Sequence, residues 1–147
     1  MLKYEPHIHS RHSDGKHSVR KILSEAVRKK IDIISITDHD TLNGSFEAIK
    51  IVNEEHLHIK VILGIEVSTK NGHLLVYGIR KEIDMGMKMS ETIEIARELG
   101  GFTVLAHPFE FYRHGIIGLK YFEYVDAIEV FNAKSYLNFL ANYFAKK

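Results

Sequence analysis

The N-terminal part of the chain contains a dense group of residues that can bind a divalent metal ion. His7 and His9 are separated by a single residue, and Asp14-Gly15 follows shortly after them. The apolar residues at the start and the turn signal at Asp14-Gly15 predict a short strand, so His7 and His9 project from the same face. Two imidazoles on one edge of a strand make half of a metal site. A histidine-rich loop or a tag remnant would give the same pattern.

Further histidine and acidic residues follow apolar segments later in the chain. Singly, each has an ordinary explanation, such as a helix cap, a strand-edge charge or a core histidine. Together they predict a metal site, because a buried charge is costly unless it is paired or bound to metal. The chain has no cysteine, so imidazole and carboxylate are its strong ligands. The segments are Thr37-Asp38-His39-Asp40, Gly64-Ile65-Glu66, Gly72-His73, Ala106-His107-Pro108 and Ile128-Glu129-Val130-Phe131-Asn132.

Alternating strand and helix patterns must position these residues. Ser18 is a suitable N-cap for the first helix, Gly100-Gly101 is a C-cap signal, and Thr69-Lys70-Asn71-Gly72 predicts a hairpin turn. Repeated strand-helix units favour a parallel sheet, whose ligands lie beyond the carboxyl ends of the strands. We predict strands at 31–37, 59–67, 73–77, 102–106 and 126–131. Helices are predicted at 18–30 and 135–147, and two further helices begin at residues 43 and 90. The helix that begins at residue 43 has Phe46, Ile49 and Val52 as its apolar residues.

Length and composition limit the class of protein. A chain of 147 residues with 45% hydrophobic content is expected to form one domain with a real core. A net charge of +1 creates no general field for nucleic acid or membranes, so an anionic substrate must be held locally by metal or by a few basic side chains. No apolar run is long enough for a signal peptide or a membrane span, and we expect a cytoplasmic protein.

Taken in chain order, the motifs resemble those of the PHP family, named for polymerase and histidinol phosphatase. They read H-x-H-x-x-x-x-D-G, T-D-H-D, G-I-E, H-L-L-V-Y-G, A-H-P and E-V-F-N, and they extend over nearly the whole chain. The resemblance implies an α/β fold, a distorted (β/α)7 barrel, with two or three metal ions that hydrolyse phosphoesters. Residues 1–147 would form a single PHP-like domain.

The resemblance also implies the metal ligands. One ion would be held by His7 and His9, and Glu66 would bridge it to a second ion. Zinc, manganese and iron all suit such a mixed nitrogen and oxygen set. The residues expected to act most directly in catalysis are Asp14, His39 and Glu66. The complete ligand set would be His7 and His9 for the first ion, Glu66, His73 and His107 for the second, and Asp14 and His39 for the third.

Other matching residues would support the ligands. Asp38 and Asp40 are expected to orient imidazole rings by accepting their remaining N–H, and Glu129 and Asn132 would line the pocket. Arg113 and Lys134 are weak candidates for phosphate binding, since an exposed basic side chain is more often solvated surface.

The sequence departs from the family pattern at its C-terminal end. The family's last motif, a Gly-Ser-Asp-Ala-His-like segment, has no counterpart before Ala145-Lys146-Lys147. We therefore expect a truncated domain, incomplete first and third metal sites, and fewer bound ions. The barrel would have an open edge, through which the protein could associate with itself or with a partner.

Three functions fit these observations. The first is a metal-dependent phosphoesterase that hydrolyses a phosphate ester of a nucleotide or other small metabolite through a metal-activated water. The second is a nuclease-like PHP member that acts on nucleic-acid ends, which the balanced charge does not favour. The third is a catalytically impaired metal-binding module, suggested by the absent last motif.

Overall fold

The computed structural model describes residues 1–108 and 121–132 of the chain. The chain forms two compact units. The first comprises Met1–Glu66 and Tyr77–Glu82, and the second comprises Val67–Val76 and the chain from Ile83 onward. The predicted helix at 135–147, Arg113 and Lys134 lie outside the described residues. The elements are β1 (Tyr4–Ile8), α1 (Val19–Arg28), β2 (Ile33–Ile36), α2 (Asn43–Glu54), β3 (Lys60–Val61), β4 (Gly64–Thr69), β5 (Gly72–Tyr77), α3 (Met89–Glu98), β6 (Phe102–Leu105) and β7 (Ala127–Ile128).

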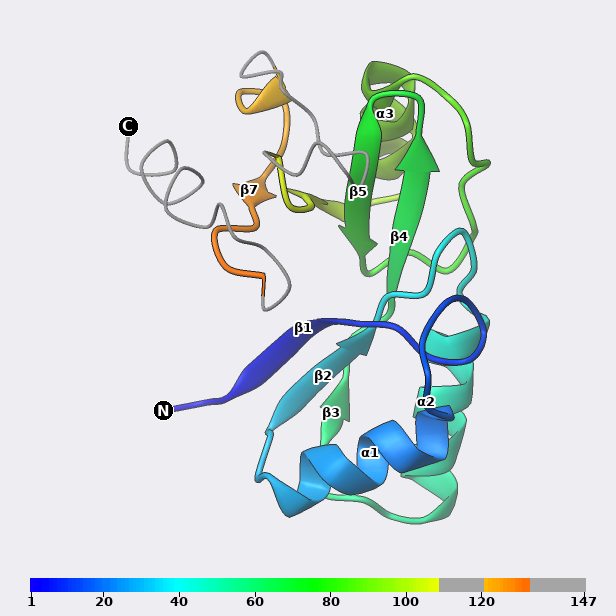
Figure 1. Ribbon diagram of the computed structural model, residues 1–147, viewed down its shortest axis with the longest axis vertical. Helices are drawn as coiled ribbons and strands as arrows, with labels where there is room; N and C mark the ends of the chain where they lie inside the picture. Colours follow the sequence, from blue (N-terminus) through cyan, green and yellow to red (C-terminus); the bar gives the residue numbers. More distant parts are fainter. Residues whose placement is uncertain (109–120, 133–147) are drawn as a thin grey trace. The chain divides into compact units, whose positions relative to one another are not determined.

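The first unit contains a parallel sheet in the order β1-β2-β3, with α1 and α2 packed beside it (Figure 1). Ser18 caps α1 as predicted, and its side chain accepts a hydrogen bond from Lys21 N at 3.3 Å. The apolar stripe of α1 is buried against the sheet. The core of this unit consists of Val19, Ile22, Leu23, Ala26, Ile34, Ile36, Ala48, Ile51 and Ile59.

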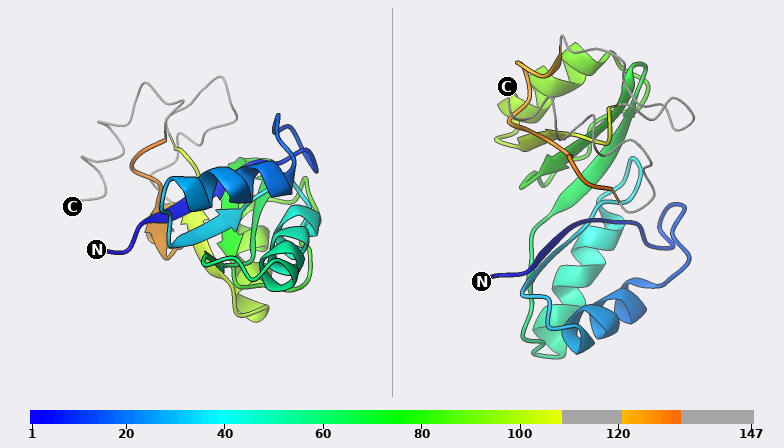
Figure 2. Two further views of the ribbon diagram at one scale, coloured as in Figure 1. Left: turned by 90° about the horizontal axis from the view of Figure 1, so that it is seen from below. Right: turned by 60° about the vertical axis from the view of Figure 1, so that its left-hand side comes forward.

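The second sheet has the order β4-β5-β6-β7. Figure 2 and Figure 1 show β4 and β5 as a hairpin, in agreement with the predicted turn. Thr69 Oγ1 donates to Gly72 O at 2.6 Å, and Gly72 has a φ of 120°, which favours glycine. Strands β6 and β7 are parallel. Helix α3 ends at Glu98, and Gly100 follows the C-cap residue Leu99 with a φ of 73°, which confirms the predicted stop signal.

Several predicted elements were wrong in detail. The strand at 59–67 is divided, because β3 pairs with β2 whereas β4 belongs to the other sheet. Strand β7 is only two residues long. The described strands therefore form two open sheets in a mixed α/β fold, and a complete (β/α)7 barrel stays a prediction.

Helix α2 buries a different face from the predicted one. Phe46 is 41% exposed, whereas the small residues Gly44, Ser45 and Ala48 are buried. The reason is a close polar contact: Ser45 Oγ donates to Ile36 O at 2.7 Å and accepts from Gly64 N at 3.0 Å. Small side chains let the helix approach these backbone groups, and a large apolar residue at this position would prevent the contact.

No helix in the described part of the chain has the length and apolar character needed to cross a lipid bilayer.

Candidate metal centre

Three predicted ligands of the first unit converge on one point. The Nε2 atoms of His7 and His9 lie 3.0 Å apart, and they lie 3.0 Å and 2.8 Å from Glu66 Oε2. His7 belongs to β1, His9 follows the end of this strand directly, and Glu66 comes from β4. The Glu66 side chain is only 1% exposed. The period-2 expectation for His7 and His9 is confirmed, because both rings contact the same carboxylate oxygen.

His39 extends this group. It follows β2, forms an isolated parallel bridge with Glu66, and places its Nε2 atom 3.7 Å from Glu66 Oε2. Backbone hydrogen bonds from Glu66 N to Asp38 O and from Asp40 N to Glu66 O hold the two segments together at 3.1 Å and 3.0 Å. The carboxyl end of a parallel strand thus supplies an imidazole to the cluster, as predicted for this sheet class.

The donor atoms fit a divalent metal ion. The sets His7, His9 and Glu66, and His9, Asp14 and His39, each offer one ligand atom per residue, with all atoms of a set within 4.8 Å of one another. Nitrogen and carboxylate oxygen donors suit zinc, manganese or iron. A proton or a cation is also needed between these groups on physical grounds. Two imidazole nitrogens at 3.0 Å and a buried carboxylate repel one another through their lone pairs unless a proton or a cation lies between them.

Asp14 contacts His9 from its other side. His9 Nδ1 donates to Asp14 Oδ1 at 2.7 Å. This bond leaves Nε2 of a neutral His9 with its lone pair toward Glu66, as in carboxylate-histidine-metal arrangements. Partial burial raises the pKa of Asp14, but His9, its hydrogen bond and the nearby His39 together lower this pKa below its ordinary value. Asp14 therefore lies at the centre, in contact with a ligand that it can orient.

Asp38 has a different contact from the predicted one. Its carboxylate is fully buried and accepts hydrogen bonds from Ser10 N at 2.6 Å, Ser10 Oγ at 2.6 Å and Ser13 Oγ at 2.8 Å. The expectation that Asp38 accepts from an imidazole ring was wrong. The loop that joins His9 to Asp14 brings serine donors to this carboxylate, so Asp38 holds the loop and acts on the ligands through it. Ser10 and Ser13 were missed, since no local signal links them to a residue so distant in sequence.

Two glycines permit the close packing around this loop. A Cβ at Gly15 would overlap the backbone of His9 and Ser10, and a Cβ at Gly44 would overlap the Asp38 carboxylate. Glycine is therefore required at both positions for steric reasons, although neither has a positive φ.

The loop after His39 is held by a residue that sequence reasoning missed. Glu82 Oε1 accepts hydrogen bonds from Thr41 Oγ1 and from Leu42 N, each at 2.8 Å. Glu82 thus provides an acceptor for a backbone N–H at the start of α2. The N-cap residue of this helix, Leu42, has no side-chain acceptor for such a bond. Asp40, between these groups, has a φ of 58°. Such a backbone conformation is uncommon outside glycine and asparagine and requires support from its surroundings.

The remaining predicted residues belong to the second unit. In the second unit, the rings of His73 and His107 are 5.5 Å apart and perpendicular, and Ala106 N donates to His73 O at 3.3 Å. His107 is buried and has a φ of 52°. The structure thus brings these two predicted ligands together, and their sharing of an ion with Glu66 stays a prediction. Asn132 Nδ2 donates to both Glu129 carboxylate oxygens, at 3.2 and 3.3 Å.

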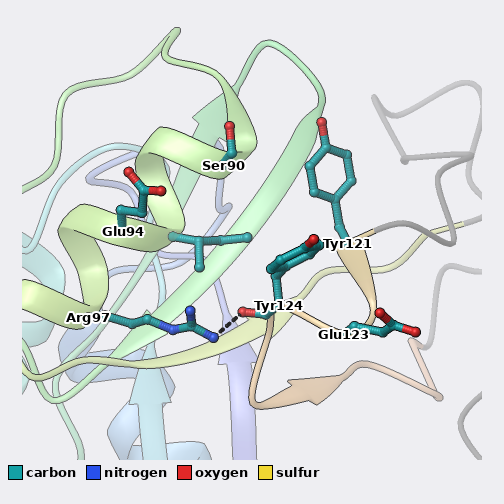
Figure 3. A pocket seen from close by; sticks show the side chains of 7 residues that line it. Ser90, Glu94, Arg97, Tyr121, Glu123 and Tyr124 are labelled. Atoms are coloured by element: carbon teal, nitrogen blue, oxygen red, sulfur yellow. Dashed lines mark hydrogen bonds between the residues drawn. The ribbon is translucent and has the colours of Figure 1, made fainter.

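A pocket of about 700 Å³ lies in the second unit, and no predicted ligand is among its lining residues. It is bounded by α3 and by the segment 121–124 (Figure 3). Arg97 Nη2 donates to Tyr124 O at 2.6 Å on its wall. Its described lining contains no histidine, so it is not the metal centre.

Comparison with known proteins identifies the family to which the chain belongs. The profile of the PHP domain matches residues 5–145. The chain belongs to the PHP family. An uncharacterised protein of Methanocaldococcus jannaschii is 31% identical over 144 residues, which is 90% of this chain and 82% of that protein. A crystal structure from Bifidobacterium adolescentis, assigned to the metal-dependent phosphoesterases, superposes with a TM-score of 0.80 at 14% identity, covering 99% of this chain and 83% of that one.

PHP relatives with a named activity match a smaller part of the chain. A 5'-3' exoribonuclease of Haemophilus influenzae is 37% identical over 67 residues, 46% of this chain and 24% of the enzyme. A phosphoribosyl 1,2-cyclic phosphate 1,2-diphosphodiesterase of Eggerthella lenta is 31% identical over 81 residues, 51% of this chain and 30% of the enzyme. The chain therefore spans less than a third of either enzyme, and the two act on different phosphoesters.

Proposed function

We propose that this PHP domain is a metal-dependent hydrolase that cleaves a phosphate ester of a nucleotide or other small metabolite. The observation that carries the proposal is the convergence of His7 Nε2, His9 Nε2 and Glu66 Oε2 within 3.0 Å of one another. A divalent ion bound there would supply a water of lowered pKa and neutralise charge on the phosphoryl oxygens. Membership of the PHP family supports this reaction class.

In this proposal the residues of the chain hold and orient the ions. His7, His9 and the buried Glu66 carboxylate would hold one ion, and Glu66, His73 and His107 are the ligands proposed for a second. His39 and Asp14 face the same group from the loops that follow β2 and β1. Asp14 fixes the tautomer of His9 through the 2.7 Å hydrogen bond. Zinc, manganese and iron are the candidate metals.

Metal analysis and aryl-phosphate turnover test the proposal. The chain should copurify with, or bind after reconstitution, a divalent ion, and His9→Ala should lose both metal and activity while remaining folded. Leu23→Ala is the control, because Leu23 is fully buried and its truncation should cost roughly 2–5 kcal/mol of stability without altering the ligands. A protein that binds no metal at neutral pH would contradict the proposal.

Two other functions would each give a different result in these experiments. A nuclease that acts on nucleic-acid ends is favoured by the similarity of about half of the chain to 5'-3' exoribonucleases. It would cleave a 5'-phosphorylated RNA oligonucleotide much faster than an aryl phosphate. An impaired metal-binding module would bind the ion and hydrolyse neither substrate.

A further inference from the structure

Strand β1 is irregular where it carries its first proposed metal ligand. Glu5 pairs with Ile34 of β2. The next pair joins Ile8 to Ile36, so two residues of β1, Pro6-His7, stand opposite one residue of β2. The proline has no N–H to donate to the strand ladder. Pairing with β2 therefore holds the backbone of this segment less firmly than the residues on either side, and it does not by itself fix the direction of the histidine.

A tyrosine from a distant part of the chain holds this segment. The hydroxyl of Tyr77 donates a hydrogen bond to Pro6 O at 3.0 Å. Tyr77 is the last residue of β5, belongs to the first unit and is only 8% exposed. A buried tyrosine ring has few conformations, so its hydroxyl is a donor with a fixed position. The bond therefore anchors the backbone directly before His7.

The ring of the same tyrosine lies against the strand that carries Glu66. A Cβ at Gly64, the first residue of β4, would lie 3.2 and 3.3 Å from the ring atoms Cδ1 and Cε1 of Tyr77. Glycine therefore lets the ring approach the backbone of β4 closely. The backbone adds a second link, because Gly78 N donates to Leu63 O at 2.9 Å. Glu66 follows Gly64 by two residues, so Tyr77 contacts both segments that meet at the centre.

We propose that Tyr77 is a positioning residue of the metal centre, which sets the distance between His7 and Glu66. This inference rests on the proposed hydrolase function. His7 Nε2 and Glu66 Oε2 lie 3.0 Å apart, and Tyr77 contacts the chain one residue before the first and two residues before the second. Its hydroxyl and its ring act through the backbone of the two strands. Metal ligands must be held within about 0.5 Å of their binding geometry by the residues behind them, and loss of such a residue weakens metal binding.

The test compares two tyrosine hydroxyl groups that bond to different parts of the first unit. Tyr77→Phe removes the hydroxyl that anchors Pro6 and keeps the ring. Tyr4→Phe is the matched control, because Tyr4 lies on the same strand as His7 and its hydroxyl bonds to Ser35 Oγ at 2.8 Å. Tyr77→Phe should bind Zn²⁺ about tenfold more weakly in competition with a chelator. The visible absorption of the Co²⁺-loaded variant should also differ from that of the wild type, since it reports the arrangement of the ligands. Tyr4→Phe should keep both the affinity and the absorption.

A second control separates positioning from stability. Leu23→Ala should lower the midpoint of thermal unfolding of the metal-free protein more than Tyr77→Phe, because it truncates a fully buried side chain whereas the other removes a single hydroxyl. Leu23→Ala should keep the wild-type affinity for Zn²⁺. If Leu23→Ala loses as much affinity as Tyr77→Phe, the affinity follows stability and the positioning role is wrong.

A measurement on the metal-free protein decides the role of Tyr77 independently of the hydrolase. The ring centroids of His7 and His9 are 5.1 Å apart, which is close enough for a nuclear Overhauser effect between their ring protons. This signal should weaken in Tyr77→Phe and stay unchanged in Tyr4→Phe. If Tyr77→Phe keeps the wild-type affinity, absorption and Overhauser signal, the positioning role is wrong and the hydrolase stands. If the wild type binds no metal, the hydrolase is wrong, and the Overhauser signal alone decides the role of Tyr77.

Discussion

Two aspartates in this protein make nearly the same hydrogen bonds and have different consequences. Asp38 follows β2 and accepts from the backbone N–H and the hydroxyl of Ser10. Asp126 precedes β7 and accepts from the backbone N–H and the hydroxyl of Thr103, at 2.8 and 2.7 Å. In both cases the carboxylate accepts from the backbone N–H and from the hydroxyl of one residue in the neighbouring parallel strand or its loop. The same pair of contacts therefore joins adjacent parallel segments in both sheets of this protein.

The difference lies in which end of the strand carries the aspartate. Asp38 stands at the carboxyl end of β2, where loops of parallel sheets bind ligands, and its donors belong to the loop between His9 and Asp14. Asp126 stands at the amino end of β7 and contacts the first residues of β6, with no predicted ligand among its partners. Asp38 is fully buried and has a third donor in Ser13, whereas Asp126 is exposed. The same contact thus serves the metal centre in one place and strand pairing in the other.

Removal of each carboxylate should give the largest contrast. Asp38→Ala leaves Ser10 N, Ser10 Oγ and Ser13 Oγ without their acceptor in a buried place, so we expect a loss of about 3–5 kcal/mol in the free energy of unfolding. Asp126→Ala should cost only about 1 kcal/mol, because water can replace an exposed carboxylate. Urea denaturation of the metal-free proteins measures both. Equal losses would mean that burial does not distinguish the two sites.

Crowding of the Asp38 carboxylate should have the next largest effect. Gly44→Ala places a Cβ against Asp38 Oδ2 and Ile36, and the required shift should cost about 1–3 kcal/mol of unfolding free energy. Metal affinity should fall as well, since Asp38 holds the loop between two ligands. Asn53→Ala, on the exposed side of the same helix, is the control for helix propensity. Wild-type stability in Gly44→Ala would show that the contact is not tight.

Asp14 tests the orienting contact without disturbing the core. Asp14→Asn should weaken metal binding about 10- to 100-fold, because the hydrogen bond that orients His9 Nδ1 is weakened. Its unfolding free energy in the metal-free state should change by less than about 0.5 kcal/mol, since the side chain is exposed. Competition with a chelator gives the affinity, and Asp84→Asn, an exposed aspartate before α3, should leave it unchanged. A stability loss without an affinity loss would assign Asp14 to the fold alone.

The smallest expected effect is the contribution of Asp126 to the stability of the protein at acid pH. The backbone N–H and hydroxyl of Thr103 hold the pKa of Asp126 below its ordinary value of 3.8. A lowered folded-state pKa means that the ionised form stabilises the protein above pH 3.8, and that this contribution disappears as pH falls through the folded-state pKa. Wild type should therefore exceed Asp126→Asn in stability at pH 6, with a difference that shrinks toward pH 2. Thermal unfolding of both proteins across this range measures it, and a constant difference would exclude this linkage.

Local features of this protein could be predicted from neighbouring residues. The Ser18 cap, the Gly100 C-cap and the hairpin at Thr69 to Gly72 involve groups within a few residues of one another. The alternation of His7 and His9 with Ile8 is likewise a property of any extended strand. The PHP resemblance follows from residue identity and order, and the family match confirms it. The local predictions succeeded because the physical interaction and the sequence signal have the same short range.

Other features depended on contacts that form only in the folded chain. Nothing near Asp38 in the sequence indicates that its partners are Ser10 and Ser13, which lie 28 and 25 residues away. The same holds for Glu82, which accepts a hydrogen bond from Leu42 at the start of α2 and lies 40 residues away from it in sequence. The face that α2 buries was mispredicted, because hydrophobicity favoured Phe46, whereas the Ser45 hydroxyl and the small Gly44 match polar groups at the ends of two strands. The sequence alone determined which groups could bind a metal ion. The tertiary structure decided which carboxylate contacts an imidazole and which holds a loop, because a hydrogen bond requires donor and acceptor within about 3 Å and only the packed chain sets that distance.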